Sequence, residues 1–262
     1  MRFRLTIEYA GTRYSGWQIQ KNARTVQGEI DRAIRAATGR KEFELYGSGR
    51  TDAGVHALAQ VAHLEIYTTM APEMLRRGIN DELPADVHVR AVDKAPYRFH
   101  ARHDAVSRSY LYQISRRRTA FAKPFVWWVR EPLDIGLMQD AAAAFAGRQD
   151  FAAFSDDDPE EKSTIVVLDG IEIVEAGALI LIRVQGSHFL WKMVRRIVGV
   201  LVAVGRRELK AFDAARLLGP DGGRGGIRAA ELTAPAAGLF LERVSYKGDR
   251  GPGPLRPLVL IE

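Results

Sequence analysis

The stretch Gly47–His56 constrains this chain most. Within ten residues it places three glycines, the acid Asp52 next to Thr51, and a histidine. Apolar runs lie on both sides of it, Phe43–Tyr46 before and Leu58–Ile66 after. Glycine permits backbone conformations that other residues avoid and allows close approach by other groups. We therefore expect a tight loop between two strands, with the acid at its tip. Two roles for that acid stay open: a turn residue bonded to its own backbone, or a carboxylate fixed for chemistry.

Hydrophobic periodicity predicts the elements of the first half. Residues 2–9 alternate apolar and polar side chains, which is typical of a half-buried strand. Thr25 is the predicted N-cap of a helix that runs to about Thr38 and stops at Gly39. Pro72 begins a second predicted helix, to about Glu82. With the strands around the Gly47–His56 loop and another over 87–91, the order is strand, helix, strand, strand, helix, strand.

The second half repeats this mixture loosely. The predicted elements are a strand over 106–114, a helix over 134–145, a strand pair over 165–174 and 179–184, helices over 188–204 and 209–217, and a strand over 239–246. Acidic residues 156–161 and glycine-rich residues 221–226 are expected loops. The pattern predicts an α+β chain of two similar halves, 1–105 and 106–262. Because no linker separates them, we expect their mostly antiparallel sheets to join into one extended central sheet flanked by helices.

Composition limits the possible classes of function. The chain has 262 residues, a formal net charge of +6 and no cysteine, which excludes disulfides, thiolate catalysis and zinc–cysteine sites. No apolar run is as long as a membrane span, and the charged, alternating N-terminus is unlike a secretion signal. We therefore expect a cytoplasmic protein. The excess of arginine and lysine favours an anionic partner such as a nucleic acid.

The residue order Gly-Arg-Thr-Asp-Ala-Gly-Val-His at 49–56 resembles the signature of the tRNA pseudouridine synthase A family. Further similar segments follow in family order, among them Phe99–Arg102 and Met193–Gly199. Ala10 and Val166 depart from the family pattern. The resemblance implies a pseudouridine synthase fold and a homodimer that needs no cofactor. It also implies an enzyme that isomerises uridine to pseudouridine at positions 38, 39 and 40 of the tRNA anticodon stem-loop.

The resemblance also implies catalytic roles for three residues. Asp52 is the expected nucleophile, Arg195 its ion-pair partner, and Tyr110 the ring that stacks on the flipped base. From helical spacing, Arg195 falls at the margin of an apolar helix face, while Lys192 and Arg196 point into solvent. On spacing alone, Arg195 could equally be a surface residue and Tyr110 a core aromatic.

A second set of residues is expected to bind the substrate: Arg50, Thr51, His56, Gly238, Leu239 and Leu241. We interpret His56 and His63 as RNA contacts or polar strand residues rather than zinc ligands, because no third ligand lies at metal spacing. Two other classes remain open. One is an RNA-binding protein without catalysis. The other is a glycoside-cleaving enzyme, although no second acid is evident near the loop.

Overall fold

The computed structural model describes residues 1–156, 163–219, 222 and 226–261. The chain forms two compact units. The first comprises Met1–Val106 with Phe240–Gly251, and the second comprises Ser107–Leu239 with Pro252–Glu262. The sequence pattern grouped 240–251 with the second half. The structure groups this segment with the first unit because strand β10 (Leu239–Tyr246) pairs with β3 (His56–Ile66).

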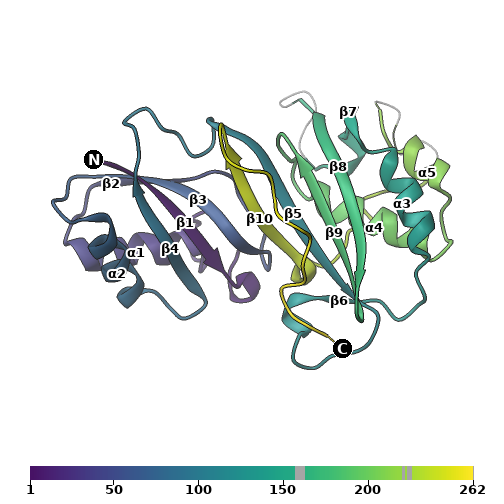
Figure 1. Cartoon of the computed structure of the whole chain (residues 1–262), viewed down its shortest axis with the longest axis horizontal. Coiled ribbons are helices and arrows are strands. Elements are labelled where there is room, and N and C mark those ends of the chain that lie inside the picture. The colour runs from purple at the N-terminus through teal and green to yellow at the C-terminus, as the bar shows by residue number, and fades with distance from the viewer. Residues whose placement is uncertain (157–162, 220–221, 223–225, 262) are drawn as a thin grey trace. The chain divides into compact units, whose positions relative to one another are not determined.

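The first unit combines a sheet with two packed helices (Figure 1). Its elements are β1 (Arg2–Tyr9), the short helix η1 (Gly11–Arg13), α1 (Val26–Thr38), β2 (Phe43–Gly47), β3, α2 (Pro72–Glu82), β4 (Val87–Lys94) and β10. Strands β4, β1, β3 and β10 are neighbours in that order, and β2 also pairs with β3. All these pairings are antiparallel except that of β10 with β3. The alternation predicted for 2–9 is confirmed, since Phe3, Leu5, Ile7 and Tyr9 are buried.

Local sequence signals set the ends of α1. The Thr25 side chain accepts a hydrogen bond from the Gly28 N–H at 3.3 Å, which satisfies one of the unpaired donors of the first turn. Gly39 ends the helix with φ of 66°, in the left-handed region that glycine enters at least cost. The predicted caps and both predicted helices of this half are confirmed.

The second unit also contains strands and helices (Figure 1). Its elements are β5 (Ala105–Ser115), η2 (Lys123–Phe125), β6 (Trp127–Trp128), α3 (Ile135–Ala143), β7 (Gly147–Asp150), η3 (Ala152–Phe154), β8 (Ile165–Ala176), β9 (Leu179–Gly186), α4 (Met193–Gly205), α5 (Ala211–Arg216) and η4 (Ala236–Gly238). Strands β5, β9, β8 and β7 are antiparallel neighbours, whereas β6 pairs with β5 in parallel. Helix α3 packs on β8, α4 and α5.

The predicted class, an α+β chain with mostly antiparallel sheet flanked by helices, is confirmed. Among the described residues, no helix is both long enough and apolar enough to cross a membrane.

Helix α4 corrects two sequence predictions. It begins at Met193 rather than at His188, because Lys192 has φ of 61° and so interrupts a helix that the apolar pattern extends further back. Arg196 was predicted to face solvent, yet it is only 3% exposed and forms an ion pair with Asp156. Lys192 bonds the same carboxylate at 2.8 Å.

Two predicted loops fall mostly outside the described residues. Of the acidic loop 156–161, only Asp156 is described; of the glycine-rich loop 221–226, only Gly222 and Gly226 are.

Candidate active site

The loop between β2 and β3 carries Asp52, and β3 holds its first part in place. The Ser48 N–H donates to the Val61 carbonyl at 2.7 Å, and its hydroxyl donates to the Gln60 side chain at 2.7 Å. The Gln60 amide in turn donates to the Gly49 carbonyl at 3.0 Å. Because Gln60 is fully buried, these bonds are shielded from competing water.

The segment after β1 braces the other side of this loop. The Tyr9 and Thr51 hydroxyls are 2.7 Å apart, and the backbone N–H of Trp17 donates to the Thr51 carbonyl at 3.1 Å. Two glycines allow the backbone of this segment to approach the backbone of the Asp52 loop closely. A Cβ on Gly11 would lie 1.9 Å from the Val55 carbonyl oxygen, and one on Gly16 would lie 2.5 Å from that of Thr51. The pattern of periodicity did not reveal this brace, although the glycines at 11 and 16 were a signal for it.

Asp52 itself is half-buried at the turn of the loop. Its carbonyl accepts the Val55 N–H at 3.1 Å, and Gly54 takes φ of 78° to complete the turn. Thr51 is buried, whereas Arg50 is exposed. The backbone on both sides of the carboxylate is therefore fixed, which is the arrangement that a group of defined direction requires.

His56 lies at the end of the loop, where β3 begins, and its side chain is buried. It is 1% exposed, and its Nδ1 accepts the Gly11 N–H at 3.0 Å. Its ring stacks on Phe240 of β10 with centroids 4.7 Å apart, where Phe240 pairs with His56 and Leu241 with Ala57. Leu241 is 2% exposed. These contacts support a positioning role for His56; that it or Leu241 contacts substrate stays a prediction.

In the second unit, Tyr110 lies within β5 and pairs with Val184 of β9. The ring is half-buried and meets Phe189 edge to face, with centroids 5.0 Å apart and planes at 80°. Phe189 belongs to the segment before α4 that was predicted to be helical. An aromatic edge-to-face contact of this kind fixes the plane of the Tyr110 ring.

Arg195 is anchored to the segment before η4. Its Nε donates to the Ala234 carbonyl at 2.7 Å, and the Ala234 N–H donates to the Arg195 carbonyl at 3.0 Å. Gly199, one turn along α4, makes this contact possible, because a Cβ there would lie 1.6 Å from the Leu232 carbonyl oxygen. The predicted position of Arg195 at the margin of the helix agrees with its half-buried state.

Tyr112 and Gly238 pack together beside this contact. The Tyr112 hydroxyl donates to the Pro235 carbonyl at 2.8 Å, and a Cβ on Gly238 would lie 2.6 Å from the Tyr112 ring. Burial raises the pKa of Tyr112 well above its ordinary value, while the nearby charge of Arg195 partly opposes this shift. Leu239, the next residue, is 5% exposed. Tyr112 thus braces the segment that carries Ala234, a role that the sequence did not reveal.

The side chains present in each unit define the available chemistry. The first unit offers a carboxylate on a braced loop, and the second offers a guanidinium and an aromatic ring on fixed backbone. Within the described parts of the chain, no three His, Cys, Asp or Glu side chains are grouped to hold a metal ion.

Comparison with known proteins shows what the chain resembles. A family model described as tRNA pseudouridine synthase matches residues 5–104 and 141–247. A protein of Citrifermentans bemidjiense named tRNA pseudouridine synthase A is 41% identical over 248 residues, covering 93% of this chain and 97% of its own length. Proteins of the same name from Pelobacter propionicus and Nitrobacter hamburgensis are 42% and 40% identical, each over at least 93% of this chain and 98% or more of their own length. A crystal structure of a Cbf5-Nop10-Gar1 complex is only weakly similar, with 12% identity and a TM-score of 0.32 over 76% of this chain and 54% of that one.

Proposed function

This chain belongs to the tRNA pseudouridine synthase family, and from that membership we infer where and with which residues it acts. It is an isomerase that forms pseudouridine in tRNA. We propose that its targets are uridines 38, 39 and 40 of the anticodon stem-loop. We further propose that Asp52 is the nucleophile, Arg195 its ion-pair partner, and Tyr110 the ring that stacks on the flipped base.

The reaction moves one bond and leaves the oxidation state unchanged. The bond between the uracil N1 and the ribose C1′ breaks, a bond between uracil C5 and the same C1′ forms, the C5 proton departs, and N1 gains a proton, so that product and substrate are isomers. No electron carrier is therefore needed. A carboxylate serves either by attack on the sugar or base, or by stabilising the cationic sugar while the base turns. A base must leave its stack first, and an aromatic ring offsets part of the stacking that is lost.

The observation that carries this proposal is the bracing of the Asp52 loop. Both faces of the loop are held by buried groups, Gln60 on one side and Tyr9 with Trp17 on the other. A turn residue in an ordinary hairpin does not need this support. In the second unit, the Arg195 Nε donates to the Ala234 carbonyl, and a planar guanidinium of this kind is the group that pairs with carboxylates in a defined direction. The proposed substrate site is completed by Arg50, Thr51, His56, Gly238, Leu239 and Leu241.

The test is release of tritium from tRNA labelled at uracil C5, measured for Asp52→Asn beside Asp93→Asn. Asp93 is an exposed acid on β4, so the control makes the same change of charge in the same unit. We expect Asp52→Asn to bind tRNA with no turnover and the control to match wild type. Wild-type turnover by Asp52→Asn would remove Asp52 from its role.

Two further variants separate the other roles. Arg195→Lys keeps the charge but loses the planar fork, so we expect a large fall in kcat; full activity would contradict the pairing role. Tyr110→Phe keeps the ring and removes the hydroxyl. Retained turnover indicates stacking alone, whereas loss of turnover with retained binding indicates proton transfer from the base carbon.

The cellular role is tested by mapping. We propose a homodimer that acts in the cytoplasm, with its joint basic surface on tRNA. Pseudouridine mapped in tRNA from cells that lack the protein should disappear at positions 38–40 and persist elsewhere. Loss at other positions would refute the proposed target.

A further inference from the structure

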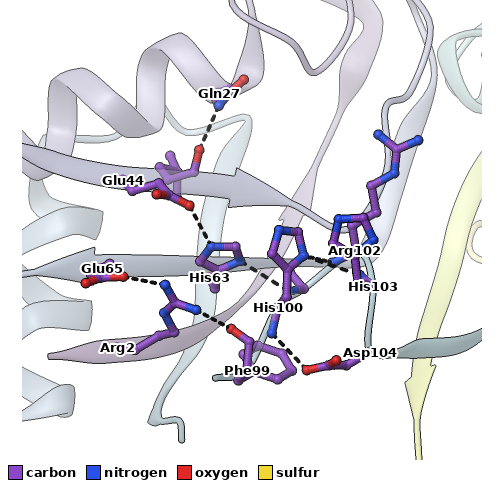
Figure 2. Close-up of polar contacts among 12 residues, drawn as sticks. Arg2, Gln27, Glu44, His63, Glu65, Phe99, His100, Arg102, His103 and Asp104 are labelled. Atoms are coloured by element: carbon purple, nitrogen blue, oxygen red, sulfur yellow. Dashed lines mark hydrogen bonds and ion pairs between the residues drawn. The ribbon is translucent and has the colours of Figure 1, made fainter. Parts of the chain in front are cut away.

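A cluster of imidazole rings lies in the first unit (Figure 2). We call it the imidazole cluster: His63, His100 and His103, with Tyr46 and Glu44 beside them. His63 is seven residues beyond His56 on β3, and at about 3.3 Å per residue this is roughly 23 Å along the strand. The imidazole rings therefore lie at the opposite end of β3 from His56, although Tyr46 directly precedes the first residue of the loop.

The inner layer of the cluster is rigid. His63 is fully buried, and its Nδ1 accepts the Ala101 N–H at 3.2 Å. Its Nε2, which therefore carries the proton, donates to the Glu44 carboxylate at 3.0 Å. Tyr46, the partner of His63 across β2 and β3, stacks on it with planes 19° apart. Buried hydrogen bonds thus fix the His63 ring, against which the outer rings pack.

The turn at 100–104 fixes the next ring. The His100 Nδ1 accepts the backbone N–H groups of Arg102 at 3.1 Å and His103 at 3.3 Å. The Asp104 carboxylate accepts the backbone N–H of His100 at 2.8 Å. The neutral ring therefore keeps its proton on Nε2, as a hydrogen-bond donor. Burial, followed by the neighbouring rings of His103 and His63, lowers the pKa of His100 and so favours this neutral form.

The outer layer is accessible to solvent. The His103 ring lies 4.2 Å from that of His100 with planes at 44°, and it is exposed, as is Tyr46. Arg102 lies in the same turn and is also exposed. His103 supports the turn through its backbone N–H, so the position of its ring is not required for the fold. The result is a firmly supported aromatic surface beside a cation.

We propose that the imidazole cluster is a second RNA-binding site, in which an unpaired nucleobase of the tRNA stacks on His103 and Tyr46 and an adjoining phosphate meets Arg102. Unpaired bases in RNA are commonly bound by stacking on aromatic side chains, histidine included, and on arginine. The net charge of +6 suits the same polyanion. The inference rests on tRNA being the substrate of this family.

The test compares tRNA affinity of His103→Ala with that of His88→Ala at constant salt. His88 is an exposed histidine on β4 of the same unit, so the control removes an equivalent ring. Because stacking of one base is worth about 1–3 kcal/mol, we expect the first variant to bind about 5- to 150-fold more weakly. The control should match wild type. His103→Phe should restore affinity, and the dependence on salt should be unchanged, since no phosphate contact is removed.

A second variant and a second RNA make the test independent of one substitution. Tyr46→Leu keeps an apolar group over His63 but lacks a π face, and we expect a loss in the same direction. Affinity for a fully paired RNA duplex should be unaffected by either variant. Wild-type affinity in His103→Ala and Tyr46→Leu, or an equal loss in His88→Ala, overturns the second site. Tritium release by the wild-type protein tests the proposed function separately.

Discussion

Replacing Gly199 with alanine tests the contact on which Arg195 depends. The new Cβ would lie 1.6 Å from the Leu232 carbonyl oxygen, whereas ordinary contact begins at 3.4 Å. The segment that carries Leu232 and Ala234 must therefore retreat by ~1.8 Å, the difference between these two distances. The obstructing atom is backbone, so no side chain can rotate out of the way. Both hydrogen bonds between Arg195 and Ala234 join α4 to this segment, so its retreat weakens them.

The expected change in the free energy of unfolding combines three terms. Overpacking costs about 1–3 kcal/mol. Weakening two hydrogen bonds, one of them to a charged group, costs about 1–3 kcal/mol. The higher helix propensity of alanine stabilises the folded state by about 1 kcal/mol relative to glycine and offsets part of this cost. We therefore expect a net destabilisation of about 1–5 kcal/mol. If the Arg195 contact acts in the transition state, kcat falls by about tenfold or more.

Urea denaturation and tritium release measure these two effects. The matched control is Gly136→Ala in α3, where the nearest atom to a new Cβ, an Asp134 carboxylate oxygen, lies at an ordinary 3.5 Å. We expect this control to be as stable as wild type, or slightly more so, with unchanged kcat. A Gly199→Ala protein with the stability and kcat of wild type would refute the reasoning.

Two other predictions concern stability. Asp156→Asn leaves the Arg196 charge buried, and should lower the free energy of unfolding by about 1–3 kcal/mol, a range reduced because Asp156 is itself 35% exposed. Glu175→Gln, at the exposed pair with Arg116, should cost less than about 1 kcal/mol in the same urea titration, and an equal loss would contradict this assignment. Hydrogen bonds from Lys192 and then Arg196 lower the pKa of Asp156 below its ordinary 3.8. The contribution of Asp156 to the free energy of unfolding should therefore be complete above about pH 4 and disappear as pH falls through the folded pKa. Denaturation of wild type and variant at a series of acidic pH values checks this. Thr25→Ala should cost about 1 kcal/mol through loss of the α1 cap, and an unchanged urea midpoint would exclude the cap as a source of stability.

Local patterns in the sequence predicted elements whose signals are local. Alternation identified β1, and Thr25 with Gly39 identified the ends of α1, because each signal acts within a few residues of its own position. The same reasoning failed at α4. Its apolar spacing continues through Phe189 and Leu190, but Lys192 has φ of 61° and interrupts the helix.

The contacts that the sequence missed join distant segments. A helical projection considers α4 by itself and therefore placed Arg196 in solvent, although Asp156, forty residues away, covers it. The brace of the Asp52 loop by Tyr9 and Trp17 was missed for the same reason. Periodicity describes one element at a time, so contacts between elements need the folded chain.

Strand β10 has a consequence for synthesis of the protein. When residues 1–106 have emerged from the ribosome, most of the first unit has been made. Still missing are the β10 residues that pair with His56 and Ala57, and the Tyr246 hydroxyl, which donates to the Ala101 carbonyl at 2.7 Å. Those residues emerge only after the intervening segment 107–238 has been translated. The nascent first unit therefore waits for that whole segment before its sheet is complete, and a fragment that ends at residue 106 lacks a strand of its own fold.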